Sequence, residues 1–161
     1  MSLVADQSLA DELKEEFVLI TGIECDAVFL EKGIHHKPST LGSKQKGVYV
    51  FLNSNCCFKV GKAGSKSKAR WNSHHYNLDK TTPSTFPKSI IKDLERFKHF
   101  FPDNKHDEID GLNAENIRQW IQNNTSRLEF IISENETDFA LSLLEALVQF
   151  RLKPEYEGKN A

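Results

Sequence analysis

Aliphatic and aromatic side chains alternate over residues 48–52, and a second extended apolar run covers residues 58–61. Between the two runs stand Asn53, Ser54 and Asn55, which are typical turn residues. A period of two side chains is the signature of an extended strand with two different faces. The pattern therefore predicts a β-hairpin.

A cationic pattern with helical spacing follows the hairpin after Gly64. Lys66, Arg70 and His74 recur every four positions, and Ser65 or Ser67 can cap a helix. The pattern predicts a helix over residues 65–75 with a positively charged stripe on one face.

The N-terminal segment has the pattern of an amphipathic helix. Leu9, Leu13 and Phe17 form its apolar edge, a capping box begins at Ser8, and the helix is expected to end near Gly22. Residues 23–29 then alternate in polarity, which indicates a short strand or an extended arm.

The C-terminal third combines a strand pattern with a long helix pattern. Residues 127–133 read as a strand, Ser133 begins a capping box, and a helix is expected over residues 136–152 before Pro154. The side chains expected to be buried by this helix are Phe139, Ala140, Leu143, Leu144 and Leu147. Glu145 stands at the margin of that apolar face, an unusual place for a carboxylate.

The region between these elements reads as a helical insertion over residues 77–126. Residues 77–86 have linker composition, and residues 103–111 read as a solvated acidic connector. One helix is predicted from Pro87 to the residue before Pro102, and a shorter helix is predicted after Asn113. The apolar stripe of the first helix consists of Ile90, Ile91, Leu94, Phe97 and Phe101.

These patterns predict a single α+β domain over residues 1–161. Its core, residues 44–76 and 127–157, holds a small three-stranded, mainly antiparallel sheet flanked by the helices at 65–75 and 136–152. The expected strands are residues 47–52, 58–61 and 127–133. Residues 1–43 form an N-terminal extension. A chain of 161 residues with 39% hydrophobic content can bury a core of this size.

Charge is distributed unevenly, although the formal net charge is only −2. Residues 32–78 contain nine Lys or Arg and no Asp or Glu, so the remainder holds 12 basic and 23 acidic residues. Such a local field suits a polyanion on one face, and a lysine-rich solvated loop and helix is an equally good interpretation of charge alone.

Cysteine usage and hydropathy place the chain among reduced, water-soluble proteins. Cys25, Cys56 and Cys57 form no disulfide framework and lack metal-finger spacing. No leader pattern is present, and no apolar run approaches the roughly 20 residues of a membrane span. We expect a cytoplasmic protein.

Two groups of motifs, at the hairpin and at the C-terminal helix, carry a resemblance. The first is Gly47-Val48-Tyr49, then Lys59-Val60-Gly61-Lys62-Ala63, then Arg70; the second is a helix with Glu145 that leads into Leu152-Lys153-Pro154-Glu155-Tyr156. In this order they resemble the GIY-YIG nuclease superfamily, and they cover about half of the chain. The resemblance implies a metal-dependent endonuclease that hydrolyses phosphodiester bonds in nucleic acid, with DNA favoured.

The resemblance also implies roles for individual residues. Glu145 would hold a single divalent cation, Mg²⁺ or Mn²⁺, and Tyr49 would act as general base if nearby cations lower its pKa. Arg70 has a planar fork that suits a phosphate in the transition state, and His74 would hydrogen-bond the phosphate or relay a proton. Nucleic-acid contacts are expected from Lys62, Lys66, Lys68 and His75.

Two departures from the family pattern bear on the site. Lys59 stands where the family usually has a second tyrosine, and it could contact phosphate or lower the pKa of Tyr49. The asparagine often found after the proline has no clear counterpart, because Glu157 follows Tyr156; Asn160 is a possible substitute. The alternative function is a catalytically inactive GIY-YIG-like module that binds nucleic acid or protein.

Overall fold

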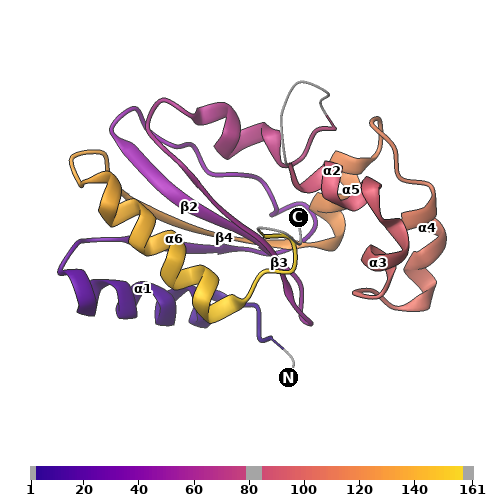
Figure 1. Cartoon of the computed structure of the whole chain (residues 1–161), viewed down its shortest axis with the longest axis horizontal. Coiled ribbons are helices and arrows are strands. Elements are labelled where there is room, and N and C mark those ends of the chain that lie inside the picture. Colours follow the sequence, from indigo (N-terminus) through magenta and orange to yellow (C-terminus); the bar gives the residue numbers. More distant parts are fainter. Residues whose placement is uncertain (1–2, 79–84, 158–161) are drawn as a thin grey trace.

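A single four-stranded antiparallel sheet forms the centre of the computed structural model, which describes residues 3–78 and 85–157 (Figure 1). The strand order is β1-β4-β2-β3, where the strands are β1 (Asp26–Leu30), β2 (Gln45–Leu52), β3 (Cys57–Ala63) and β4 (Ser126–Ser133). The predicted α+β class and the antiparallel hairpin are confirmed, since β2 and β3 pair with Tyr49 opposite Gly61.

The prediction of three strands was wrong by one strand. β1 pairs with β4 along its whole length, from Asp26 opposite Ile131 to Leu30 opposite Arg127. The alternating segment at residues 23–29 could not be separated from an extended arm by sequence, because a short strand is defined by its partner. β4 consequently lies inside the sheet, and β1 forms the edge opposite β3.

One face of the sheet is covered by α1 (Gln7–Thr21) and α6 (Asp138–Leu152). Their inner side chains, among them Leu13, Phe17, Leu144 and Val148, pack with the aliphatic residues of the strands in one continuous core. Within the described chain, no helix is long and apolar enough to cross a membrane. The three cysteines are free, and burial raises the pKa of Cys25 to about 12.

The ends of these two helices differ in part from the predicted ends. Asp6, two residues before the expected cap, accepts a hydrogen bond from Leu9 N, and α1 ends as predicted at Gly22 with a left-handed φ of 69°. α6 is capped by Thr137, whose hydroxyl accepts from Ala140 N, and not by the box at Ser133.

Two of the side chains that α6 was predicted to bury are exposed, so the prediction is wrong for them. Phe139 is 87% exposed and Leu143 is 41% exposed, whereas the expected Ala140 and Leu144 are buried. The cause is that α6 is apolar on both sides, so periodicity could not decide which stripe faces the sheet.

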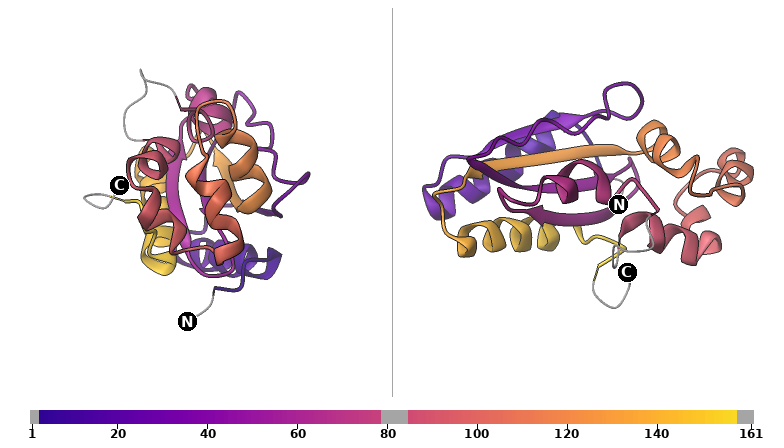
Figure 2. Two further views of the ribbon diagram at one scale, coloured as in Figure 1. Left: turned by 90° about the vertical axis from the view of Figure 1, so that its right-hand side faces the viewer. Right: turned by 90° about the horizontal axis from the view of Figure 1, so that it is seen from above.

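The other face of the sheet carries an aromatic core, in which Phe51, Phe58, Trp71, Tyr76 and Phe86 are fully buried. The helices of the insertion form a lobe beyond one end of the sheet, on the right in Figure 1 and in the view from above in Figure 2. They are α2 (Phe86–Lys92), α3 (Leu94–Lys98), the 3₁₀ helix η2 (Asp103–Lys105), α4 (His106–Asp110) and α5 (Ile117–Asn124).

Two predictions about the insertion are wrong. The single helix expected from Pro87 is divided at Asp93, whose φ of −148° and ψ of 81° are not helical and whose carboxylate caps α3 at Arg96 N. The expected acidic connector at 103–111 is itself mostly helical. Residues 79–84 of the expected linker lie outside the described part of the chain.

The helix expected over residues 65–75 is shorter and differently wound. Helical structure begins at Lys68, and η1 (Arg70–His74) is a π-helix. Lys66 lies in the preceding turn. Because Lys66 lies outside the helix, the prediction that Lys66, Arg70 and His74 share one helical face is wrong.

A buried ion pair joins η1 to the sheet. Arg127 and Glu129, both 0% exposed, lie two residues apart on β4 with Arg127 Nε 2.9 Å from Glu129 Oε2. Arg127 also donates to Trp71 O at 3.0 Å and to the Tyr76 hydroxyl at 3.4 Å. Glu129 accepts from Ser39 N at 3.1 Å, and the guanidinium lies 5.1 Å from the Tyr49 ring centre. Both charges of the pair are therefore matched by polar partners.

Arg127→Met should lower the free energy of unfolding by about 3–5 kcal/mol, because it leaves the Glu129 charge buried without its partner. Arg151→Met is the matched control, since Arg151 pairs with Glu12 and Glu16 at the surface and should change stability by about 1 kcal/mol or less. Urea denaturation of both variants measures the difference. Equal losses would show that the buried pair is not what fixes η1 to the sheet.

Candidate functional site

Tyr49 crosses the sheet to its edge because a glycine stands opposite it. Gly61 is its register partner on the edge strand β3, and a Cβ added at Gly61 would lie 2.5 Å from Tyr49 Cζ. Only a residue without a side chain lets the ring lie flat over β3 at this position. The Val-Gly-Lys motif of the sequence thus has a steric function.

Two nitrogen donors meet at the Tyr49 hydroxyl oxygen. Arg70 Nε lies 3.4 Å from it, and His75 Nε2 is in hydrogen-bond contact with it. Phe86 N donates to His75 Nδ1 at 3.4 Å, so the network assigns the imidazole proton to Nε2, which donates to the tyrosine. The oxygen therefore accepts two hydrogen bonds and keeps its own proton to donate.

Burial controls the protonation of Tyr49 and His75. Desolvation raises the pKa of Tyr49 to about 12, although the hydrogen bond and charge of Arg70 act in the opposite direction. Desolvation, followed by the charges of Lys59 and Arg70, lowers the pKa of His75 to about 3. At neutral pH both side chains are uncharged, and Tyr49 is fully shielded from solvent.

Glu145 reaches the same edge from the opposite face of the sheet, on α6. Its carboxylate lies 3.9 Å from Lys62 Nζ, and Lys62 also donates to the hydroxyl of Ser142 at 2.9 Å. Among the described residues no hydrogen bond to this carboxylate is found. Desolvation raises the pKa of Glu145 and Lys62 opposes that shift, with smaller effects from Glu157, Arg70 and Lys59. The carboxylate of Glu145 therefore interacts electrostatically with these four charged side chains.

The C-terminal tail covers the outer edge of β3 up to Val60. Its backbone donates from Glu155 N to Cys57 O and from Tyr156 N to Phe58 O, at 3.0 and 2.9 Å. Glu157 then accepts from Val60 N at 3.1 Å and pairs with Lys59 Nζ at 3.2 Å. Lys59 is consequently buried and its charge is paired with Glu157, which differs from the phosphate contact expected as one of its roles.

Glu157 is the site residue that the sequence analysis missed. Its charge contributes to the raised pKa values of Glu145 and Arg70, although the hydrogen bond to Tyr49 is the largest cause for Arg70. The available signal is its position directly after the Leu-Lys-Pro-Glu-Tyr tail, where it stands out only as a departure from the family pattern.

The structure thus brings most of the predicted catalytic residues to one edge. Tyr49 and Arg70 are in hydrogen-bond contact, while Glu145 and Lys59 belong to the same electrostatic cluster. His74 is half-buried, and the structure shows it acting only on the pKa of His75. Of the expected nucleic-acid contacts, Lys66 and Lys68 are exposed and Lys62 is half-buried beside Glu145, but His75 lies in the interior against Tyr49.

The carboxylates of the site suit one hard divalent cation. The described residues contain no group of three or more His, Cys, Asp and Glu side chains able to hold a metal. Glu145 offers an incompletely paired carboxylate, and Glu157 adds a second one nearby. Mg²⁺ is usually bound by one or two carboxylates together with water and substrate phosphates, so the residues present fit this ion.

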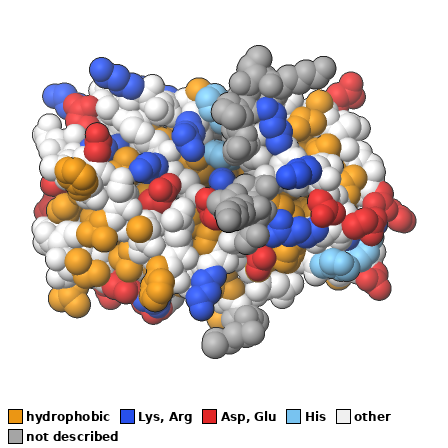
Figure 3. Space-filling view, in the orientation of Figure 1, with side chains coloured by type: hydrophobic (Ala, Val, Ile, Leu, Met, Phe, Trp, Pro, Cys, Tyr) orange, Lys and Arg blue, Asp and Glu red, His pale blue; other side chains and the backbone are white. Residues whose placement is uncertain are grey.

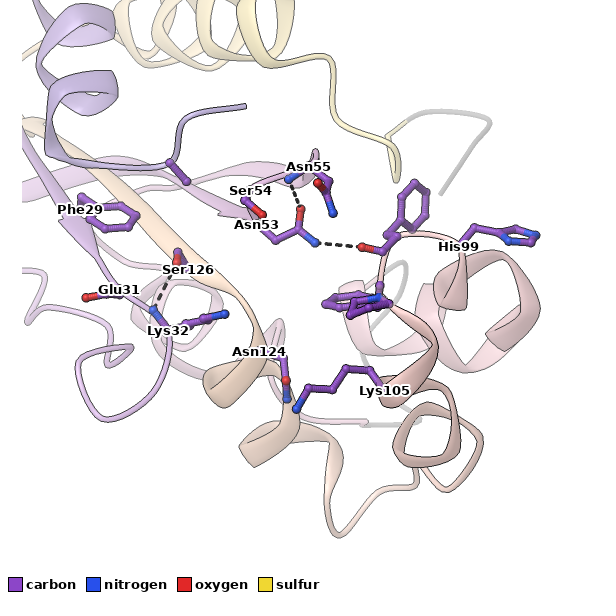
Figure 4. Close-up of a pocket in the computed structure, with 14 residues that line it drawn as sticks. Phe29, Glu31, Lys32, Asn53, Ser54, Asn55, His99, Lys105, Asn124 and Ser126 are labelled. Carbon is purple, nitrogen blue, oxygen red and sulfur yellow. Dashed lines mark hydrogen bonds between the residues drawn. The ribbon is translucent and has the colours of Figure 1, made fainter. Parts of the chain in front are cut away.

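A separate pocket of about 690 Å³ lies beside the hairpin turn (Figure 4). Its walls include Phe29, Lys32, Asn53 and Lys105, and Asn53 Nδ2 donates to Phe100 O at 3.2 Å. The pocket shares no lining residue with the cluster around Tyr49.

Comparisons of the chain with family models, curated proteins and solved structures found no match.

Gly61→Ala should displace the Tyr49 ring, because the added methyl group collides with it. We expect a loss of about 1–3 kcal/mol in the free energy of unfolding. Gly64→Ala, three residues later, is the matched control because an added Cβ there meets no atom within 4 Å. Urea denaturation compares the two, and an unaltered stability in Gly61→Ala would show that the ring is not held over β3.

Proposed function

We propose that this protein is a metal-dependent endonuclease that hydrolyses phosphodiester bonds in nucleic acid, with DNA the favoured substrate. The observation that supports the proposal is the meeting of Tyr49, Arg70 and Glu145, from three separate elements, at the β3 edge. Phosphodiester hydrolysis needs an acceptor for the proton of the attacking water, positive charge at the phosphate oxygens and a cation site. The three side chains match these needs one by one.

Arg70 connects substrate binding to the exposure of the Tyr49 oxygen. Its side chain is exposed, whereas the tyrosine oxygen behind it is shielded. A phosphate that draws the guanidinium outward into a bidentate contact would uncover the Tyr49 oxygen for an attacking water. Tyr49 becomes a base only in its minor phenolate form, which it reaches by releasing its proton to bulk water, and the phenolate then takes the proton of the attacking water. His75 Nε2, which stays hydrogen-bonded to that oxygen, stabilises the phenolate.

The cation would be held by Glu145, with Glu157 as the second available carboxylate. When bound, Mg²⁺ or Mn²⁺ supplies positive charge that polarises the phosphate and stabilises the charge developing on its oxygens. Lys62, which pairs with Glu145, limits repulsion between this carboxylate and an approaching phosphate.

Exposed lysines beside η1 extend the positive charge beyond the reacting phosphate. Lys66 and Lys68 lie on the turn and the first helical residues before Arg70, in the stretch that holds no acidic residue. We propose that they follow the nucleic-acid backbone as point charges, which attracts substrate without specifying sequence.

The second candidate is a binding module that retains this arrangement without cutting. It is favoured by the burial of Tyr49 and by its pKa of about 12, both of which oppose base catalysis at neutral pH. The dependence of the cleavage rate on pH separates the two candidates.

If Tyr49 is the general base, the cleavage rate should rise about tenfold per pH unit between about pH 6 and 9. The reason is that the reactive phenolate is a minor species at every pH below its pKa of about 12, and its share grows with pH. Tyr49→Phe should remove this slope and lower the rate at pH 9 at least about 10²-fold. Single-turnover cleavage at constant ionic strength measures both effects.

Tyr156→Phe is the matched control, because the Tyr156 hydroxyl is buried and no hydrogen-bond partner for it is found among the described residues. Its pH profile should equal that of the unaltered protein. A Tyr49→Phe protein that keeps the full slope would assign the proton acceptor to another group.

Glu145→Gln should abolish cleavage while nucleic-acid affinity stays similar or rises, because the amide keeps the shape but loses the charge that holds the cation. Arg70→Ala should damage both binding and cleavage, since the guanidinium meets the phosphate before and during the reaction. Asp138→Asn is the control, because Asp138 is a fully exposed carboxylate on the same helix. Cleavage, binding and thermal stability are measured on all three.

Full cleavage by a stably folded Glu145→Gln protein would remove the metal assignment. Binding without cleavage in the unaltered protein, with Mg²⁺ and with Mn²⁺, would favour the binding module.

A further inference from the structure

The outer side of α6 carries an apolar stripe that the fold leaves uncovered. Phe139 and Phe150 are 87% and 76% exposed, Leu143 is 41% exposed, and Ala146 is exposed between them. Their spacing of four, three and four residues places all four on one helical face, opposite the face that Leu144 and Val148 bury in the core. Figure 3 shows hydrophobic side chains gathered along α6 in the left half of this view.

This stripe is symmetric about the middle of the helix. Phe139 and Phe150 lie equally far from the midpoint between Leu144 and Glu145, and so do Leu143 and Ala146. Two copies of α6 packed antiparallel would therefore place Phe139 of each copy against Phe150 of the other. They would also place each Leu143 against an alanine, so that large side chains meet small ones at the centre.

Charge at the two ends of α6 favours the same arrangement. The acidic residues Glu134, Glu136 and Asp138 stand at its start, and Arg151 and Lys153 stand at its end. Arg151 is already paired with acidic side chains of α1, and Asp138 lies 3.5 Å from Lys46 Nζ. The Asp138 side chain is nevertheless fully exposed, and Lys153 is exposed as well. An antiparallel pair puts the basic end of each helix beside the acidic end of the other and opposes the two helix dipoles.

We propose that two copies of this chain associate through the outer face of α6, as an antiparallel helix pair around a two-fold axis. The helix is about 22 Å long, so its outer face buries much less than the roughly 800 Å² per partner of a standard stable interface. The association is accordingly weak, with a dissociation constant on the order of 10–100 µM. Joint binding to one nucleic acid strengthens it by raising the effective concentration.

The symmetry has a consequence for catalysis, which rests on the proposed function. A two-fold axis between antiparallel helices turns the same flank of both helices toward the same side. Glu145 lies on one side of α6, between the exposed stripe and the buried face, so the two candidate sites lie on the same side of the dimer. A duplex bound on that side would meet one site for each strand.

Sedimentation equilibrium from about 5 to 500 µM protein, without nucleic acid, tests the dimer. The unaltered chain should show a monomer–dimer equilibrium, and Phe139→Glu or Phe150→Lys alone should weaken it at least about 100-fold. Ile34→Glu, which charges an 81% exposed side chain on a different surface, should leave it unchanged. Circular dichroism and thermal melting confirm that each variant is folded.

An equimolar mixture of the Phe139→Glu and Phe150→Lys chains tests the register. In the antiparallel pair, the glutamate introduced into one chain meets the lysine introduced into the other while the remaining two phenylalanines still meet. The mixture should therefore dimerise within about tenfold of the unaltered chain. A parallel pair or a non-specific apolar contact predicts no rescue. A chain that stays monomeric at every concentration, or a mixture that stays monomeric, overturns the proposal.

Cleavage of a supercoiled plasmid separates this proposal from the proposed function. The unaltered protein should yield linear product directly, whereas Phe139→Glu should nick at a similar rate and form linear product only through independent nicks. Direct linear product from the Phe139→Glu chain overturns the arrangement of the two sites. A dimer without any nicking would contradict the nuclease and leave the helix pair standing.

Discussion

The structure depends on one buried ion pair, Arg127 with Glu129, beneath the candidate site. Two charges without solvent exposure are stable only when the polar atoms around them have partners, and here the partners come from the loop at Ser39 and from η1. The pair therefore fixes where Trp71 and Tyr76 lie on the sheet. Because Arg70 and His75 lie beside these two residues in sequence, the same pair also sets the donors that reach Tyr49.

The candidate site lies at an edge of the sheet because that is where its two faces meet. Tyr49 and Arg70 belong to the aromatic face, whereas Lys62 and Glu145 belong to the face covered by α6. Gly61 removes the side chain that would separate them. The described part of the C-terminal tail, up to Glu157, pairs with β3 as far as Val60 and so covers the edge of the sheet beside Lys59. An edge strand that is partly capped in this way also avoids pairing with other chains.

Much of the candidate site can be predicted from the sequence, because its residues stand in recognisable motifs. The motifs predict Tyr49, Arg70 and Glu145 as site residues, and the structure places the three in one cluster. The burial of His75, the charge pairing of Lys59 and the arrival of Glu157 were not predictable. Each depends on contacts between segments about 10 to 97 positions apart, and short motifs carry no information on such distances.

The sequence by itself determined the elements whose signals are local: the hairpin, the strand predicted at 127–133, the helices at both ends and the α+β class. Only the tertiary structure decided the fourth strand, the π winding of η1, the break at Asp93 and the side of α6 that faces the sheet. The physical reason is that turn residues, caps and side-chain periods act over a few positions. Strand partners, buried charges and the choice between two apolar faces are set by which distant surfaces pack together.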